Sequence, residues 1–207
     1  MPDLPIILYE GVEDKGFLDA LLEVLGIKNK FALHPDCGGK DKFKQLLDAL
    51  VIPKHAAIII VADNDGNPNE AFKNIQKQIG DSGFSIPTKP REIAITAGLS
   101  PVSVLMLPWD GEDGCLETLC LSAANPKYAA QLACADALVK CAGDGWPVSH
   151  KSKLRMRGFL SSICRSNPNT SLQYAWKTDN GRPGDIFPLK DVAVYQKISE
   201  YFKSFAP

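Results

Sequence analysis

Apolar runs and amphipathic stretches alternate along the first two thirds of the chain. Short apolar runs at residues 5–9, 30–34 and 56–62 predict β-strands, and the stretches 16–26, 41–52 and 67–80 carry apolar residues at helical spacing. Two further strands are predicted at 92–97 and 102–108, and a helix over 116–124. This alternation is typical of an α/β domain with a mostly parallel sheet and flanking helices.

The run at residues 56–62 is apolar on both faces, as a central parallel strand covered by helices must be. The helix after it opens with Asn67 as predicted N-cap, Pro68 at the first helical position and Glu70 completing a capping box. From about residue 125 the pattern becomes helical, with Gly and Pro breaks. We therefore expect a core over residues 1–125 and a helical C-terminal extension over 126–207 that packs on it.

Composition describes an ordinary globular chain of 207 residues, with 45% hydrophobic residues and a formal net charge of −1. No apolar run is long enough to span a bilayer, and the first residues show no basic segment leading into an apolar signal core, so a cytoplasmic location is expected. The six cysteines form no C-x-x-C pair, which indicates reduced, mostly buried thiols. The near-zero net charge leaves nucleic-acid binding open.

Acidic residues follow two of the predicted strands directly. Glu10 comes after the first strand, and Asp63 and Asp65 come after the central one. In an open parallel sheet, ligands bind outside the carboxyl ends of the strands. If Asp63 and Asp65 stay extended, their side chains point the same way, and the three carboxylates repel one another unless a cation neutralises them. Oxygen ligands of this kind favour Mg²⁺ or Mn²⁺.

The order of these features matches a known domain. A strand ending in Glu-Gly, then a helix, a strand and a helix, and then a buried strand ending in Asp-x-Asp-Gly is the motif order of the Toprim domain. Over roughly residues 5–125 the chain resembles this family, and more closely its small stand-alone branch, which is similar to the overcoming-lysogenization-defect (OLD-like) nucleases. The resemblance implies a compact Rossmann-like fold with a metal site at the strand ends.

Site residues follow from the same resemblance. It implies that Glu10 acts as acid/base or metal ligand, and that Asp63 and Asp65 are metal ligands. Asp14 matches an acidic position that helps to hold a metal in the nuclease branch.

Structural interpretations of these acidic residues stay open beside the functional ones. Asp14 is also a good N-cap for a helix that begins near Gly16. The Asp-x-Asp pair can instead form a turn, with Asn64 and Gly66 as turn formers.

A later acidic stretch, residues 110–119, follows the last predicted strand. It resembles the Gly-x-Leu-Glu-x-Leu stretch of the nuclease branch, whose glutamate approaches a second metal. Here that residue is Glu117, and Asp110, Glu112 and Asp113 are nearby alternatives. The other interpretation is a glutamate on a solvated helix face.

Basic residues gather in two places. Lys40 follows two glycines after the second strand and can approach a phosphate, or it is a solvated loop lysine. Residues 150–160 carry Lys151, Lys153, Arg155 and Arg157 in alternation with other residues. This is compatible with a helix that lays one charged side over the acidic crevice, where a lysine contacts phosphate and offsets transition-state charge. The alternative is a solvated helix face.

The chemistry that fits these residues is metal-assisted hydrolysis of phosphodiester bonds in DNA or RNA. The chain has no room for the tyrosine-bearing strand-passage domain of a topoisomerase or the zinc module of a primase. An alternative is a catalytically silent Toprim-like partner or docking subunit in a defence or toxin-like system. A phosphate-accepting receiver is disfavoured, because the last strand offers Trp109 and Asp110 where a lysine is needed. No P-loop is present, so nucleotide control needs a separate ATPase, and a homodimer is possible.

Overall fold

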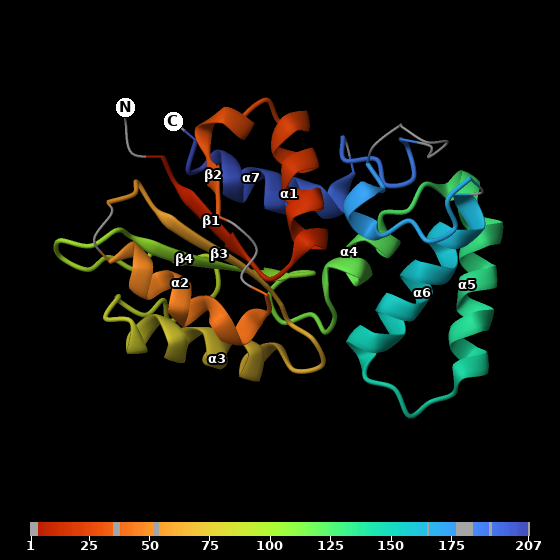
Figure 1. Ribbon diagram of the computed structural model, residues 1–207, viewed down its shortest axis with the longest axis horizontal. Helices are drawn as coiled ribbons and strands as arrows, with labels where there is room; N and C mark the ends of the chain where they lie inside the picture. The colour runs from red at the N-terminus through yellow and green to blue at the C-terminus, as the bar shows by residue number, and fades with distance from the viewer. Residues whose placement is uncertain are drawn as a thin grey trace.

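A four-stranded parallel sheet in the order β2-β1-β3-β4 forms the centre of the computed structural model, with helices on both of its faces (Figure 1). The structure describes residues 4–34, 38–51, 54–164, 166–176, 184–190 and 192–206. The predicted α/β fold class, a Rossmann-like parallel sheet flanked by helices, is confirmed.

Apart from a strand predicted at residues 92–97, the elements of the first 125 residues follow one another in the order that the hydrophobic pattern predicts. The strands are β1 (Ile6–Tyr9), β2 (Ala32–Leu33), β3 (Ile58–Asp63) and β4 (Val102–Leu107). The helices are α1 (Val12–Val24), α2 (Phe43–Leu50), α3 (Pro68–Asp81), α4 (Leu116–Ser122), α5 (Ala129–Ala142), α6 (Val148–Ile163) and α7 (Ala193–Lys203). Short 3-10 turns are η1 (Lys28–Lys30), η2 (Lys40–Lys42), η3 (Pro126–Tyr128) and η4 (Leu172–Tyr174).

The central strand β3 is buried along its whole length, as its sequence predicts. Because strand side chains alternate, Ile58 and Ile60 pack with α2 and α3 on one face, while Ile59 and Val61 pack on the other face. Helices α1 and α7 cover that second face (Figure 1). Two apolar layers therefore hold the sheet between them.

Strand register brings the carboxyl ends of β1 and β3 together. Tyr9 pairs with Val61, and Asp63 pairs with Leu107 of β4. The segments that follow these strands therefore emerge at one edge of the sheet, near α4 (Figure 1). Glu10 is the first residue after β1. This is the edge at which parallel sheets bind ligands.

The C-terminal helices share the core of the sheet. Ile198 and Phe202 of α7 belong to the same buried cluster as Ile7 and Ile59, and Phe159 of α6 joins that cluster. Helices α5 and α6 form a hairpin beside α4 (Figure 1). The division into a core at 1–125 and an extension at 126–207 stays a prediction.

One predicted strand is wrong. Residues 92–97 form no strand; they make a single antiparallel bridge between Ala94 and Val102, with N–H···O distances of 2.8 and 2.9 Å. Ile93 and Ile95 are exposed, so this segment has no second layer to pack against.

The start of α3 differs from the prediction in one detail. Asn67 accepts a hydrogen bond from the Glu70 N–H at 3.2 Å, as an N-cap does, and Pro68 occupies the first turn. The Glu70 carboxylate accepts a hydrogen bond from Lys73 Nζ at 2.9 Å, and no capping box forms at this helix start among the described residues.

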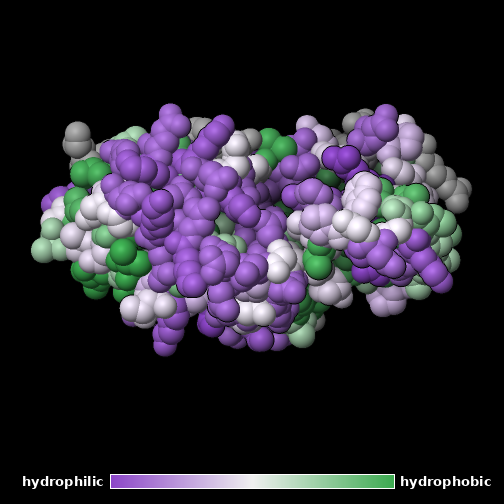
Figure 2. All heavy atoms as spheres, turned by 90° about the horizontal axis from the view of Figure 1, so that it is seen from below, coloured by the Kyte–Doolittle hydropathy of each residue, from purple (hydrophilic) through white to green (hydrophobic). Residues whose placement is uncertain are grey.

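The surface over α2 and α3 is mostly hydrophilic (Figure 2). Within the described part of the chain, no helix is both long enough and apolar enough to cross a membrane. Among the cysteines that the structure describes, Cys115, Cys120 and Cys164 are buried, while Cys134 and Cys141 are exposed. Cys37 lies outside the described residues.

Candidate metal centre

Carboxylates from four elements line one small pocket of about 200 Å³ at the carboxyl edge of the sheet. Glu10 follows β1, Asp14 lies in the first turn of α1, Asp63 ends β3, and Glu117 lies in the first turn of α4. Lys153 of α6 is the basic residue on the same wall. Glu13, also in the first turn of α1, lines the same space. We refer to this space, with these six residues, as the acidic pocket.

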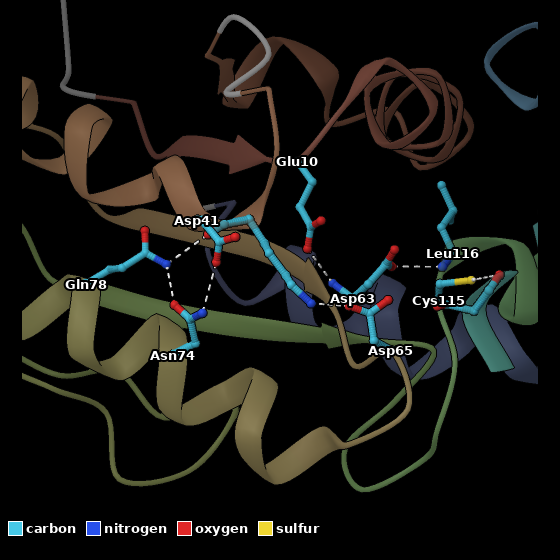
Figure 3. Close-up of polar contacts among 10 residues, drawn as sticks. Glu10, Asp41, Asp63, Asp65, Asn74, Gln78, Cys115 and Leu116 are labelled. Carbon is cyan, nitrogen blue, oxygen red and sulfur yellow. Dashed lines mark hydrogen bonds and ion pairs between the residues drawn. The ribbon is translucent and has the colours of Figure 1, made fainter. Parts of the chain in front are cut away.

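Asp63 is fixed by hydrogen bonds from two sides. Its Oδ1 accepts the Leu116 N–H at 2.9 Å, and its own N–H donates to Glu10 Oε1 at 2.9 Å. Figure 3 shows the Glu10 carboxylate directed toward the Asp63 backbone and Leu116 beside the Asp63 carboxylate. These two hydrogen bonds join the end of β3 to the residue that follows β1 and to the start of α4.

Asp14 enters the pocket because α1 begins earlier than predicted. Gly11 is extended, with φ −154°, and is the N-cap of a helix that starts at Val12. Asp14 is therefore the third helical residue, and its Oδ2 accepts the Gly11 N–H at 2.9 Å. The expectation that Asp14 caps a helix starting near Gly16 is wrong, although its carboxylate does satisfy a free N–H at the helix start.

Glu117 is placed by a tight turn before α4. Gly114 has φ +130°, and a Cβ at this residue would lie 2.5 Å from Thr118 Oγ1. That hydroxyl accepts the Cys115 N–H at 3.2 Å and so caps α4. Glycine is therefore required here by both conformation and space.

The alternatives to Glu117 lie elsewhere. Asp110 forms an ion pair with Arg91, and Glu112 and Asp113 are exposed. Glu117 is 9% exposed and is the acidic residue of this stretch that lines the acidic pocket. The interpretation of Glu117 as a solvated helix residue is therefore wrong.

Burial and mutual repulsion raise the pKa values of the pocket carboxyls. Burial, followed by the charge of Glu10, raises the pKa of Asp14 to about 7. Burial and the charges of Asp14, Glu10 and Glu117 raise the pKa of Asp63 well above its usual value. The pKa of Glu10 is raised by burial, against the hydrogen bond from Asp63. Crowded carboxyls of this kind are stabilised by a nearby positive charge.

Lys153 supplies part of that charge. Burial alone lowers its pKa, but the charges of Glu117 and Asp63 outweigh burial, so that the pKa of Lys153 is raised. The ammonium group therefore stays charged beside the carboxylates at neutral pH.

Asp63, Cys115 and Glu117 form a group that can hold a metal ion. One ligand atom from each lies within 4.8 Å of the other two, and all three residues are buried. Burial and the charges of Asp63 and Glu117 strongly raise the pKa of the Cys115 thiol, so it stays protonated. The charged donors are then carboxylate oxygens, which fit a hard divalent cation.

The sequence did not single out Cys115. Its position within the GCLETL stretch, two residues before Glu117, is the signal that could have identified it.

Asp65 and Lys40 lie next to the acidic pocket and contact each other. Asp65 has φ +53°, so the backbone is no longer extended after Asp63, and the condition for parallel Asp63 and Asp65 side chains is not met. Lys40 Nζ forms an ion pair with the Asp65 carboxylate. Burial by itself lowers the pKa of Lys40, but the hydrogen bond to Asp65 raises it overall. The predicted ligand role of Asp65 and catalytic role of Lys40 stay predictions.

The basic residues of α6 do not form one charged side. An α-helix turns about 100° per residue, so residues two apart point in different directions. Lys151 Nζ lies 3.8 Å from an Asp144 carboxylate oxygen, and Arg155 pairs with Asp136 of α5. Lys153 alone of the α6 cations lines the acidic pocket, so the predicted single charged side is wrong and the role of Lys151 stays a prediction.

One family model matches nearly the whole chain, and the chain is distantly similar to a solved structure. The model of a family described as "Protein of unknown function (DUF3226)" matches residues 5–205. A search of curated proteins finds no significant match. One similar solved structure is the C-terminal region of the Xanthomonas campestris pv. campestris OLD protein, at 15% identity and a TM-score of 0.44, covering 98% of this chain and 95% of that one. A likeness this distant assigns no function.

Proposed function

Since the chain belongs to DUF3226, a family of proteins of unknown function, we propose an activity from its own residues: a metal-dependent nuclease that hydrolyses phosphodiester bonds of nucleic acid at the acidic pocket. The observation that carries this proposal is the convergence of Glu10, Asp14, Asp63 and Glu117 in a pocket of about 200 Å³. The motif resemblance to Toprim nucleases supports it.

A divalent cation fits these residues. Asp14 is 8% exposed, and Asp63 and Glu117 are each 9% exposed, so water screens their repulsion poorly. Ionising such a group in the folded protein costs free energy unless a positive charge lies close by. Mg²⁺ or Mn²⁺, held by Asp63 and Glu117, would activate water and stabilise the leaving oxygen of a phosphodiester.

The remaining pocket residues suit the other parts of such a hydrolysis. The raised pKa of Glu10 favours its protonated form more than in a free glutamate, and a general acid must carry a proton. Lys153 keeps its charge at the pocket wall, where an ammonium group can contact a phosphate oxygen. Nucleic acid is the proposed substrate because the Lys153 ammonium group, which can contact a phosphate, lies beside the metal-binding carboxylates at the carboxyl edge of the sheet. A homodimer and a separate ATPase partner stay predictions.

Cleavage assays on the wild type and three single variants test the proposal. Labelled single-stranded and duplex DNA and RNA are incubated with Mg²⁺, with Mn²⁺ or with chelator. Asp63→Asn keeps an oxygen for the Leu116 N–H, and Glu117→Gln keeps the size of the side chain. Each is expected to lower the metal-dependent rate by about 100-fold or more, since charged oxygens bind these cations far better than amides do.

Glu112→Gln is the matched control, because Glu112 is exposed and lies in the loop before α4. Its rate should stay within about twofold of the wild type. Cleavage by Asp63→Asn at the wild-type rate would refute the acidic pocket as the reaction centre. No cleavage of any substrate by the wild type would favour a catalytically silent docking subunit.

A further inference from the structure

A larger pocket opens beside the acidic pocket. It has a volume of about 510 Å³ and lies between α6 and residues 168–172, and Glu13, Glu117 and Lys153 line both spaces. We call it the side pocket. A molecule bound there would reach the edge of the acidic pocket through these three residues.

One wall of the side pocket is cationic. Lys153 and Arg157 are four residues apart on α6, so they lie on the same helix face, about 6 Å apart along its axis. Lys153 stands where the two pockets meet, and Arg157 stands farther along the side pocket. Among the described residues Arg157 has no carboxylate within ion-pair distance, whereas Arg155 pairs with Asp136. Arg157 is therefore available to an anionic ligand.

Away from Glu13 and Glu117, which lie where the two pockets meet, the other walls combine apolar and neutral polar groups. Met156, Leu160 and Leu172 are buried core residues that also line the space. Asn169 is exposed at the rim and offers both a donor and an acceptor. The Ser171 hydroxyl has no hydrogen-bond partner among the described residues. The apolar and polar walls can contact a flat, partly apolar ring with polar edges. Lys153 and Arg157 can contact a phosphate.

Pockets of about 300–1,000 Å³ hold compact organic ligands, so the side pocket has room for one nucleotide. A base can enter such a pocket only when it is not stacked within a duplex. From size and chemistry together we infer that the side pocket binds one unpaired nucleotide of the substrate strand. This rests on the proposed nuclease function and adds the substrate class: a single strand, a strand end or a base turned out of its stack.

The test measures binding in chelator, so that it does not depend on cleavage. Fluorescence anisotropy follows labelled oligothymidylate, oligouridylate and a blunt DNA duplex on the wild type, Arg157→Gln and Arg155→Gln. Single strands should bind the wild type more tightly than the duplex. Arg157→Gln should weaken single-strand binding about tenfold, because a phosphate contact is lost. Arg155→Gln, the control of equal charge on the same helix, should stay within about twofold.

Competition identifies what the side pocket recognises. Thymidine or uridine 5′-monophosphate should displace the labelled single strand at lower concentration than inorganic phosphate, because the apolar wall contacts the base. Equal competition by phosphate, or unchanged binding by Arg157→Gln, would overturn the inference.

Failure of the proposed function gives a different result. Binding that depends on Arg157 without cleavage in Mg²⁺ or Mn²⁺ would refute the nuclease proposal and keep the nucleotide site. Cleavage that depends on Asp63 but is unaffected by Arg157→Gln on every substrate would support the nuclease proposal and refute the nucleotide site.

Discussion

The fold buries the Asp14 carboxyl group beside another carboxyl group, which makes its ionised form unfavourable. Asp14 is 8% exposed, lies beside Glu10, and is fixed by the Gly11 N–H at 2.9 Å. Its pKa of about 7 compares with 3.8 for an unperturbed aspartate. Folding therefore favours the protonated form, and without a metal this group loses its contribution to stability as the pH rises from about 4 to about 7.

Asp14→Asn is expected to stabilise the metal-free protein at neutral pH, because asparagine cannot ionise and keeps an oxygen for the Gly11 N–H. The gain in free energy of unfolding over the wild type should grow by roughly 2–4 kcal/mol between pH 4 and pH 8, then level off. Urea denaturation in chelator at several pH values measures it. Mg²⁺ should reduce the gain, since a bound cation stabilises the ionised wild-type site.

Asp113→Asn is the control for that series, because Asp113 is exposed and lies outside the acidic pocket. Its effect on stability should vary little with pH. A pH-independent effect of Asp14→Asn would contradict the account of a neutral, buried Asp14 carboxyl.

The position of a site residue could be predicted from the sequence where that residue lies at the end of a strand. Glu10 and Asp63 come directly after apolar runs, and parallel strands bring such residues to one edge. The backbone beyond a strand was not predictable in the same way: Asp65 turns to φ +53° and pairs with Lys40, a contact between residues 25 positions apart. Cys115 was missed because a cysteine that is part of no C-x-x-C pair is usually a core residue.

At the scale of elements, one glycine lets α1 and η4 touch. A Cβ on Gly16 would lie 2.5 Å from the Cα and from the carbonyl oxygen of Gln173. Backbone atoms cannot move aside as a flexible side chain does. The close contact holds η4, and with it the neighbouring residues 168–172 that form a wall of the side pocket.

Gly16→Ala is expected to lower the free energy of unfolding by about 1–3 kcal/mol, although alanine is the better helix former. Gly80→Ala in α3 is the matched control. There the added Cβ would meet only the end of the Ile86 side chain, at 2.8 Å, and Ile86 is exposed. Chemical denaturation should therefore show Gly80→Ala to be neutral or slightly stabilising. Equal stability of the two variants would contradict the role given to the α1–η4 contact.

Element types were predicted well where periodicity is strong, as in β3 and α3. Residues 92–97 have the composition of a strand but only one bridge to β4, since nothing covers their Ile side chains. For α6, the alternation of basic residues was read at a period of two, whereas a helix sorts residues by a period of 3.6. Lys153 and Arg157 therefore face the pockets, and Lys151 does not.

Across the whole molecule, the acidic pocket depends on distant parts of the chain. Glu10 and Asp63 come from the sheet, while Lys153 comes from α6, and both parts contribute to one buried cluster through Ile59 and Phe159. The sequence predicted that the C-terminal helices pack on the sheet. It suggested the basic helix at residues 150–160 as the one over the acidic crevice, but not which of its cations lines the pocket, because that depends on packing between segments far apart in the chain.

Titration calorimetry with Mn²⁺ tests most directly whether the acidic pocket holds a metal. The wild type should bind Mn²⁺ and release protons on binding, detected as a heat that depends on the buffer, because Asp14 and Asp63 have raised pKa values. Asp63→Asn and Glu117→Gln should each weaken binding by about tenfold or more, and Glu112→Gln should not. No Mn²⁺ binding by the wild type, or equal binding by all four proteins, would contradict the account.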